Sequence, residues 1–303
     1  MTSDDRSWAG AGLDPLAREA LASGLPASEV WSLLMGVLEE RARGRGPANL
    51  REQWRQDRFV QPCAVDQRSL LELDRHLFAA AAAFEAIELS PLAPLGVCAA
   101  VALASQNKIV STARGTEVVS DPTNVLALEC ARRLQGGATG PLRLATSHRC
   151  TRAQAVPKRP GFAAHFRMFC LASAGYELEN RALTAGALAE HINTHLAALD
   201  LLGREGYRVA ATGVRILSIE RNAELARRVA AAVRGAPVEH QVLDHAYYDG
   251  LRFMIDVQAP DGSTLPLIDG GAFDWLRKLT SNNRLVYVAS GMGSQLIATV
   301  FRP

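Results

Sequence analysis

The segment that decides the fold lies between residues 142 and 174 and reads LRLATSHRCTRAQAVPKRPGFAAHFRMFCLASA. It begins with the strand-like run Leu142–Thr146 and ends with the apolar run Phe166–Ala174. Between them lies a loop that contains Pro157 and Gly161, residue types that interrupt helices and strands. The segment therefore predicts two strands joined by a loop.

Further strands and helices are predicted around this segment, and they do not alternate one to one. Strands are expected at Ala86–Leu89, Ile109–Ser111, Glu117–Val119, Val209–Ile219, Leu251–Val257, Leu265–Asp269 and Leu285–Ala289. Helices are expected at Leu70–Phe84, Thr123–Leu134, Ala182–Leu202, Asn222–Val233 and Phe273–Thr280, with Gln295–Phe301 as a helix or a strand. The Asp261-Gly262 pair predicts a hairpin turn. Together these features predict an α/β (α+β) fold, with a largely antiparallel sheet flanked by helices.

The N-terminal part of the chain has a different texture. Residues 1–13 are polar and small, as expected for a tail. From Leu16 to Arg43 the apolar residues recur at helical spacing, with a break near Gly24. We therefore expect a tail and helical extension over residues 1–65 and a core over residues 66–303.

Composition excludes several classes of protein. The chain has 303 residues, 33 Lys and Arg against 31 Asp and Glu, and a net charge of +2, so it has no general electrostatic attraction to nucleic acid. Its five cysteines are odd in number and widely spaced, which favours a reducing, cytoplasmic setting over a disulfide framework. The polar N-terminus is unlike a secretory signal, and no apolar run reaches the roughly 18 residues of a membrane span.

Four segments, in this order along the chain, resemble the motifs of histidyl-tRNA synthetase, a class II aminoacyl-tRNA synthetase. They are Ser120–Asn124, similar to the amino-acid-binding turn; His148–Arg152 with His165–Phe169, similar to motif 2; Asp244–Gly250, similar to the Tyr-Tyr-Thr-Gly segment; and Asp269–Asp274, similar to the glycine-rich segment. Ser290–Gly293 falls where motif 3 begins. The resemblance covers Leu70 to the C-terminus and implies a class II catalytic core that forms a homodimer.

The resemblance implies a role for the charged residues of these segments. Arg149 is expected to be the catalytic cation that holds the carboxylate and the α-phosphate of ATP, since its planar fork suits two oxyanions. Arg152, with Lys158 and Arg159, would meet the nucleotide phosphates or form an ordinary solvated loop. Asp121 and Thr123 would bind an α-ammonium group, cap the following helix, or do both. Their predicted ligands are an amino acid and ATP with Mg²⁺.

The remaining candidate residues are aromatic or small. Phe166 is expected either to stack on adenine or to be an ordinary core residue. Tyr247 and Tyr248 would border a pocket for a small molecule, and alternation along a strand would turn one of them into the core. Gly270 and Gly271 would allow the backbone to approach a ligand closely, or would form a tight turn.

Several departures from the family pattern bear on function. The Gln and Glu that read histidine in the family fall on Met168 and Ala172, and an Arg falls near Leu243. The stretch Gln295–Ala298 has no cation where motif 3 has an Arg for the γ-phosphate. These losses predict that adenylation is weak or absent. Because the sequence stops at Pro303, we expect no anticodon-binding domain and no specific tRNA reading through one.

Three functions remain open at this point. The first is a degenerate paralogue that binds a ligand and regulates a separate catalytic subunit, as the histidyl-tRNA synthetase-like regulatory subunit of ATP phosphoribosyltransferase does in histidine biosynthesis. The second is an enzyme that activates another amino acid or carboxylate with ATP for a non-tRNA acceptor. The third is a scaffold with a vestigial pocket.

Two histidines of one predicted helix are candidate metal ligands. His191 and His195 stand four residues apart in the helix predicted at Ala182–Leu202, a spacing that can bind a metal ion from one helix face. The Glu that usually lies between such histidines is absent. We therefore expect a solvated helix face and no metal.

Overall fold

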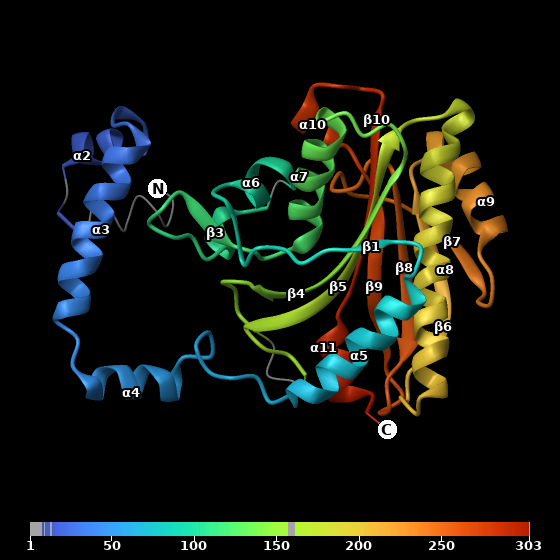
Figure 1. Cartoon of the computed structure of the whole chain (residues 1–303), viewed down its shortest axis with the longest axis horizontal. Coiled ribbons are helices and arrows are strands. Elements are labelled where there is room, and N and C mark those ends of the chain that lie inside the picture. Colours follow the sequence, from blue (N-terminus) through green and yellow to red (C-terminus); the bar gives the residue numbers. More distant parts are fainter. Residues whose placement is uncertain (1–7, 9, 13, 103, 157–160, 303) are drawn as a thin grey trace. The chain divides into compact units, whose positions relative to one another are not determined.

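The computed structural model describes residues 8–302, apart from residues 9, 13, 103 and 157–160. The chain divides into two compact units (Figure 1). One contains the N-terminal residues up to Gln61 together with Ser111–Thr116, and the other contains Pro62–Val110 and the residues from Glu117 onward. Most of the expected tail, and the loop residues Lys158 and Arg159, lie outside the described residues.

The first unit is helical. Its helices are α2 (Pro15–Glu19), α3 (Ala27–Arg43) and α4 (Pro47–Gln56). A π-helical turn at Ala20–Gly24 separates α2 from α3, so the predicted break near Gly24 is confirmed. In α2, α3 and α4 no described residue is buried.

The second unit is built on an eight-stranded sheet with the order β1-β4-β5-β10-β9-β8-β6-β7 (Figure 1). The strands are β1 (Glu85–Ala86), β4 (Leu142–Thr151), β5 (His165–Tyr176), β6 (Ala211–Ser218), β7 (Val238–Val242), β8 (Leu251–Gln258), β9 (Thr264–Phe273) and β10 (Leu285–Met292). Only the outer pairs β1–β4 and β6–β7 are parallel. The predicted antiparallel sheet is therefore confirmed. A separate small sheet pairs β2 (Leu92–Pro94) with β3 (Thr116–Val118).

Helices cover both faces of the large sheet, and each face has its own apolar core. On one face, called the α8 face, lie α5 (Gln67–Ala80), α8 (Ala182–Arg204), α9 (Ala223–Ala232) and α11 (Ser294–Val300). On the other, called the α7 face, lie α6 (Val97–Val101), α7 (Pro122–Gln135) and α10 (Trp275–Thr280). Neighbouring residues of a strand serve opposite faces, so Leu144 belongs to the α7 face and Ala145 to the α8 face. Among the described helices, none combines the length and apolar character needed to cross a bilayer.

The structure decides one local prediction, overturns another and adds a strand that was not predicted. Gln295–Phe301, expected as a helix or a strand, is the helix α11. Ile109–Ser111 is not a strand but follows a short 3₁₀ turn at Gln106–Lys108. The edge strand β7 was not predicted, because its central residues Glu239 and His240 are polar and exposed and give little hydrophobic signal.

The expectation of a solvated face for His191 and His195 is wrong. Both side chains have 0% exposure and lie between α8 and the sheet. His191 contacts Ser173 Oγ through Nε2 at 3.0 Å and Ser290 Oγ through Nδ1 at 2.9 Å. His195 Nε2 contacts the same Ser290 hydroxyl at 2.8 Å. Burial lowers the pKa of His195 to about 3 and that of His191 well below its ordinary value, so both imidazoles are neutral.

Candidate ligand-binding site

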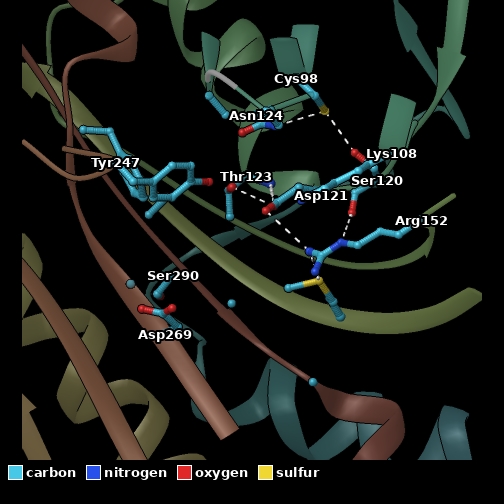
Figure 2. A pocket seen from close by; sticks show the side chains of 18 of the residues that line it. Cys98, Lys108, Ser120, Asp121, Thr123, Asn124, Arg152, Tyr247, Asp269 and Ser290 are labelled. Atoms are coloured by element: carbon cyan, nitrogen blue, oxygen red, sulfur yellow. Dashed lines mark hydrogen bonds and ion pairs between the residues drawn. The ribbon is translucent and has the colours of Figure 1, made fainter. Parts of the chain in front are cut away.

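A cavity of about 420 Å³ opens on the α7 face of the sheet (Figure 2). Its wall is built by the start of α7, the ends of β4 and β5, the loop before β8, and parts of β9 and β10. Of the predicted ligand-binding residues, six line it: Asp121, Thr123, Arg152, Tyr247, Tyr248 and Gly270. Segments far apart in the sequence therefore meet at one place, although ligand binding by these residues stays a prediction.

Asp121 both caps α7 and lines the cavity. Its Oδ1 accepts hydrogen bonds from the Thr123 backbone N at 3.0 Å and the Thr123 hydroxyl at 2.7 Å, with Pro122 in the first turn. Its Oδ2 lies 3.7 Å from Arg152 Nη2, and Arg152 Nε donates to the Ser120 carbonyl at 3.1 Å (Figure 2). The capping interpretation therefore holds, and it leaves the second carboxylate oxygen facing a guanidinium.

Arg152 stacks over an aromatic ring. Its Cζ lies 5.2 Å from the centroid of the Phe166 ring, and its Nη2 lies 3.8 Å from the Met168 sulfur. The solvated-loop interpretation of Arg152 is wrong, because the side chain is held by an aspartate, a carbonyl and a ring. One face of the Phe166 ring therefore carries this guanidinium, and stacking of the ring on adenine stays a prediction.

Two tyrosines form one side of the cavity. Tyr248 is buried, and its hydroxyl donates to Asp269 Oδ1 at 2.8 Å. Arg252 holds the same carboxylate with two hydrogen bonds of 2.9 and 2.6 Å. Tyr247 is more exposed, and its ring packs edge-on against Tyr248 and Phe273. The alternation argument fails here because this segment is a turn, so both rings reach the cavity; burial raises the pKa of both phenols and keeps them neutral.

The inner wall contains a thiol and an amide that sequence reasoning missed. Asn124 Nδ2 donates to the Cys98 sulfur at 3.1 Å, and that sulfur lies 3.0 Å from Ser120 Oγ (Figure 2). Burial raises the pKa of the Cys98 thiol, which favours its protonated form. The buried carboxylate of Glu117 fixes this wall by accepting hydrogen bonds from the backbone N of Gly96 at 2.7 Å and of Cys98 at 3.3 Å. Only Asn124, inside the Ser120–Asn124 motif, had a sequence signal that could have identified it.

Arg149 does not lie in the cavity where it was predicted to hold the carboxylate and the α-phosphate. It lines neither this cavity nor the adjoining one described below, because strand alternation turns its side chain to the α8 face. There Nη1 lies 3.0 Å from the Cys63 sulfur, 3.0 Å from His165 Nδ1 and 3.3 Å from Gln295 Oε1. Among the described residues of the segment that resembles motif 2, Arg152 is the cation that lines the cavity.

The two glycines of β9 are required by the sheet itself. A Cβ on Gly270 would lie 2.4 Å from the Ser290 Cβ, and one on Gly271 would lie 2.4 Å from the Leu251 carbonyl oxygen and 2.5 Å from the Tyr248 ring. Gly270 lines the cavity and Gly271 does not. The tight-turn interpretation is wrong, because both residues lie within the strand β9, and close approach to a ligand stays a prediction for Gly270.

A second, more apolar cavity of about 300 Å³ adjoins the first. The two share Arg152, Gln154, Met168 and Gly293 as lining residues. Phe166 and Leu296 line the second cavity alone. Phe166 therefore does not reach the first cavity but lies directly beyond its rim.

The described residues of the second cavity do not fit a nucleoside triphosphate. Arg152 is paired with Asp121, and Arg167 is paired with Asp74 at 2.5 Å. Leu296 lies near the start of α11, in the stretch where the family's motif 3 has an arginine for the γ-phosphate and this chain has no cation. A triphosphate needs several unpaired cations, so this arrangement argues against an intact ATP clamp among the described residues.

The histidine-reading positions are also altered. Met168 lines both cavities, and Ala172 is fully buried in the sheet. A thioether is a weak hydrogen-bond acceptor and a methyl group is none, so an imidazole N–H would find no strong acceptor at either position. The cavity is bordered by polar side chains at the start of α7 and by the Met168 thioether on β5.

Comparison with solved structures identifies this architecture. The apo histidyl-tRNA synthetase of S. aureus superposes with a TM-score of 0.55 at 14% identity, over 76% of this chain and 64% of that one. The chain has the fold of a class II aminoacyl-tRNA synthetase catalytic domain. A structure described as an ATP phosphoribosyltransferase regulatory subunit/histidyl-tRNA synthetase from Bacillus halodurans gives a TM-score of 0.57 at 15% identity, over 79% of this chain and 81% of that one.

The class II likeness extends beyond histidine-related proteins. A threonyl-tRNA synthetase structure from Cryptosporidium parvum gives a TM-score of 0.55 at 11% identity, over 76% of this chain and 62% of that one. This chain thus spans less than two thirds of two of the three structures. No protein-family model matches the chain, and no curated protein sequence matches it. At these identities the likeness establishes the class II fold and leaves activity to be argued from the site.

Proposed function

We propose that this chain is a ligand-binding, regulatory protein on the class II fold, and that its cavity takes an α-amino acid. The observation that carries the proposal is the pair Asp121–Arg152 on the cavity wall, whose charged atoms lie 3.7 Å apart. An amino acid could exchange this loose pair for two charge-assisted contacts, its ammonium group on Asp121 and its carboxylate on Arg152. Thr123 Oγ would complete the ammonium site.

The proposal includes weak or absent adenylation. The arginines of the second cavity are paired to aspartates, and Leu296 supplies an apolar surface near the expected γ-phosphate position. Adenylation requires unpaired cations to offset the repulsion between two anions, and both described arginines of the second cavity are already paired. Amino-acid binding is then a signal rather than the first step of a reaction.

By analogy of fold, we propose that the signal is passed to a separate catalytic subunit, as for a regulatory subunit of ATP phosphoribosyltransferase in histidine biosynthesis. One structurally similar protein carries that description. We also propose a class II-type homodimer in the cytoplasm. The five cysteines are all free thiols, which supports a reducing compartment.

Calorimetry and thermal-shift titrations test the ligand. Each of the twenty amino acids is titrated with and without ATP and Mg²⁺, and an amino acid should raise the midpoint of unfolding while ATP alone should not. Asp121→Asn is the matched variant, since it keeps a capping side chain and removes the charge. Failure of every amino acid to bind would refute the proposal.

A second candidate is an ATP-dependent enzyme that activates an amino acid or carboxylate for a non-tRNA acceptor. The adjoining positions of the two cavities, with Phe166 in the second and Arg152 at their border, favour it. Amino-acid-dependent exchange of pyrophosphate into ATP would establish this activity. A flat result with amino acids that demonstrably bind would leave the regulatory proposal standing.

A further inference from the structure

One amide side chain on the wall of the cavity is only partly satisfied by the described residues. Asn124 lies in the first turn of α7 with 2% exposure, and it lines the cavity. Its Nδ2 is held by the Cys98 sulfur, whereas Oδ1 has no hydrogen-bond partner among the described residues. Figure 2 shows Asn124 on the wall that also carries Thr123 and Asp121. Because a buried acceptor without a partner is unfavourable, an N–H or O–H donor on a ligand would stabilise this oxygen.

The position of Asn124 relative to Asp121 relates this oxygen to the proposed ammonium site. Asn124 follows Asp121 by three residues, which corresponds to about 4.5 Å along the helix axis. With the ammonium group on Asp121 and the carboxylate on Arg152, as proposed, the side chain is the part of the ligand left to meet Asn124. The other polar groups there, Cys98 and Ser120, already contact each other at 3.0 Å.

We infer that Asn124 selects an α-amino acid whose side chain ends in an uncharged N–H or O–H donor, and that it rejects a side-chain carboxylate. This inference rests on the proposed function and names its ligand class. A carboxylate offers only acceptors and would place its charge against the Asn124 oxygen and near Asp121. An apolar side chain would leave that oxygen unpaired and dehydrated.

Matched ligands test this selection by calorimetry. The trios are glutamine, glutamate and methionine, and asparagine, aspartate and leucine; within each trio the side chains are similar in size and differ in hydrogen bonding. In the trio whose length fits, the carboxamide should bind at least about tenfold more tightly than the carboxylate and the apolar member. Histidine serves as a further uncharged donor of different shape.

Variants of Asn124 assign the selection to this residue. Asn124→Leu should reduce the preference for the carboxamide over the apolar ligand to within about twofold. Asn124→Asp, which keeps the size and the acceptor, should preserve the preference over the apolar ligand and increase the discrimination against the carboxylate. If Asn124→Leu does not fold, Asn124→Asp still tests the inference. Gln241→Met, on the edge strand β7 and outside both cavities, is the control and should leave all ratios unchanged.

The outcomes separate this inference from the proposed function. A carboxylate preference that Asn124→Leu abolishes would mean that the amide is rotated and presents N–H groups, which overturns the inference. Equal binding of all members of both trios, or a carboxamide preference that survives Asn124→Leu, also overturns it while leaving amino-acid binding intact. Binding by no amino acid at all would overturn both.

Discussion

The two faces of the sheet use similar polar residues for different purposes. Arg149 and Arg152 stand three residues apart at the end of β4, yet Arg149 lies on the α8 face and Arg152 at the cavity on the α7 face. On the α8 face the polar groups bond to one another, as His191 and His195 do through Ser290. On the α7 face they border a cavity of about 420 Å³. Strand alternation therefore decides which of these two arginines borders the cavity and which is held among the polar groups of the α8 face.

The largest expected effect concerns the α8 face and acid. His195 has a pKa of about 3 and that of His191 is also lowered, against about 6.5 in the unfolded chain. As the pH falls below 6.5, the two imidazoles therefore bind protons in the unfolded chain but stay neutral in the folded chain. The stabilising effect of the neutral imidazoles is complete above that pH and is lost toward the folded pKa. Between pH 8 and pH 5 the free energy of unfolding should fall by about 2 kcal/mol per histidine.

Urea unfolding at several pH values measures this loss. His195→Gln and His191→Gln should each remove part of the pH dependence, whatever they do to stability at pH 8. The difference between wild type and variant isolates the histidine contribution from that of carboxylates, which titrate in the same experiment. Identical pH slopes for wild type and both variants would show that the buried pair does not control acid stability.

The next effect compares the two arginines directly. Arg152→Met should weaken binding of the amino acid by about 30-fold, because a charge-assisted contact worth roughly 2 kcal/mol is lost. Arg149→Met should change it by less than about twofold, since Arg149 lies outside both cavities. Calorimetry on both variants gives the ratio. Equal losses, or a larger loss for Arg149→Met, would reverse the assignment of the two faces.

A smaller effect is a gain in affinity for ATP. Leu296→Arg returns a cation to the second cavity near the motif 3 position. It should strengthen ATP binding by roughly 5- to 10-fold, the effect of one partly solvated ion contact. Leu296→Gln, polar but uncharged, is the control. Unchanged ATP affinity in Leu296→Arg would mean that the second cavity is not a remnant nucleotide site.

The smallest effect concerns the wall of the first cavity. Glu117→Gln should weaken the hydrogen bonds that hold Gly96 and Cys98, because a neutral amide oxygen is a weaker acceptor than a carboxylate. Hydrogen exchange in residues 96–108 should accelerate by about fivefold, with α8 unaffected. Glu239→Gln, on the exposed edge strand β7, is the matched control. Uniform acceleration across the chain would indicate global destabilisation instead.

The comparison of the two faces also shows where sequence reasoning was sufficient. Apolar runs, the Asp261-Gly262 turn and the order of the motifs predicted the antiparallel sheet and its class II likeness. The motif at Ser120–Asn124 predicted a capped helix start, and Asp121 does cap α7. These features are local, since they depend on spacing and turn chemistry within a few residues.

The sequence by itself determined the fold class, the helix starts and the absence of a cation from Gln295–Ala298, because each is encoded in consecutive residues. The tertiary structure alone decided that Arg152 rather than Arg149 faces the cavity, that His191 and His195 are buried, and that Cys98 meets Asn124. A shift of one residue along a strand moves each side chain to the opposite face of the sheet. Contacts between segments far apart in the sequence leave no signal in the local sequence. The chemistry of the cavity depends on both.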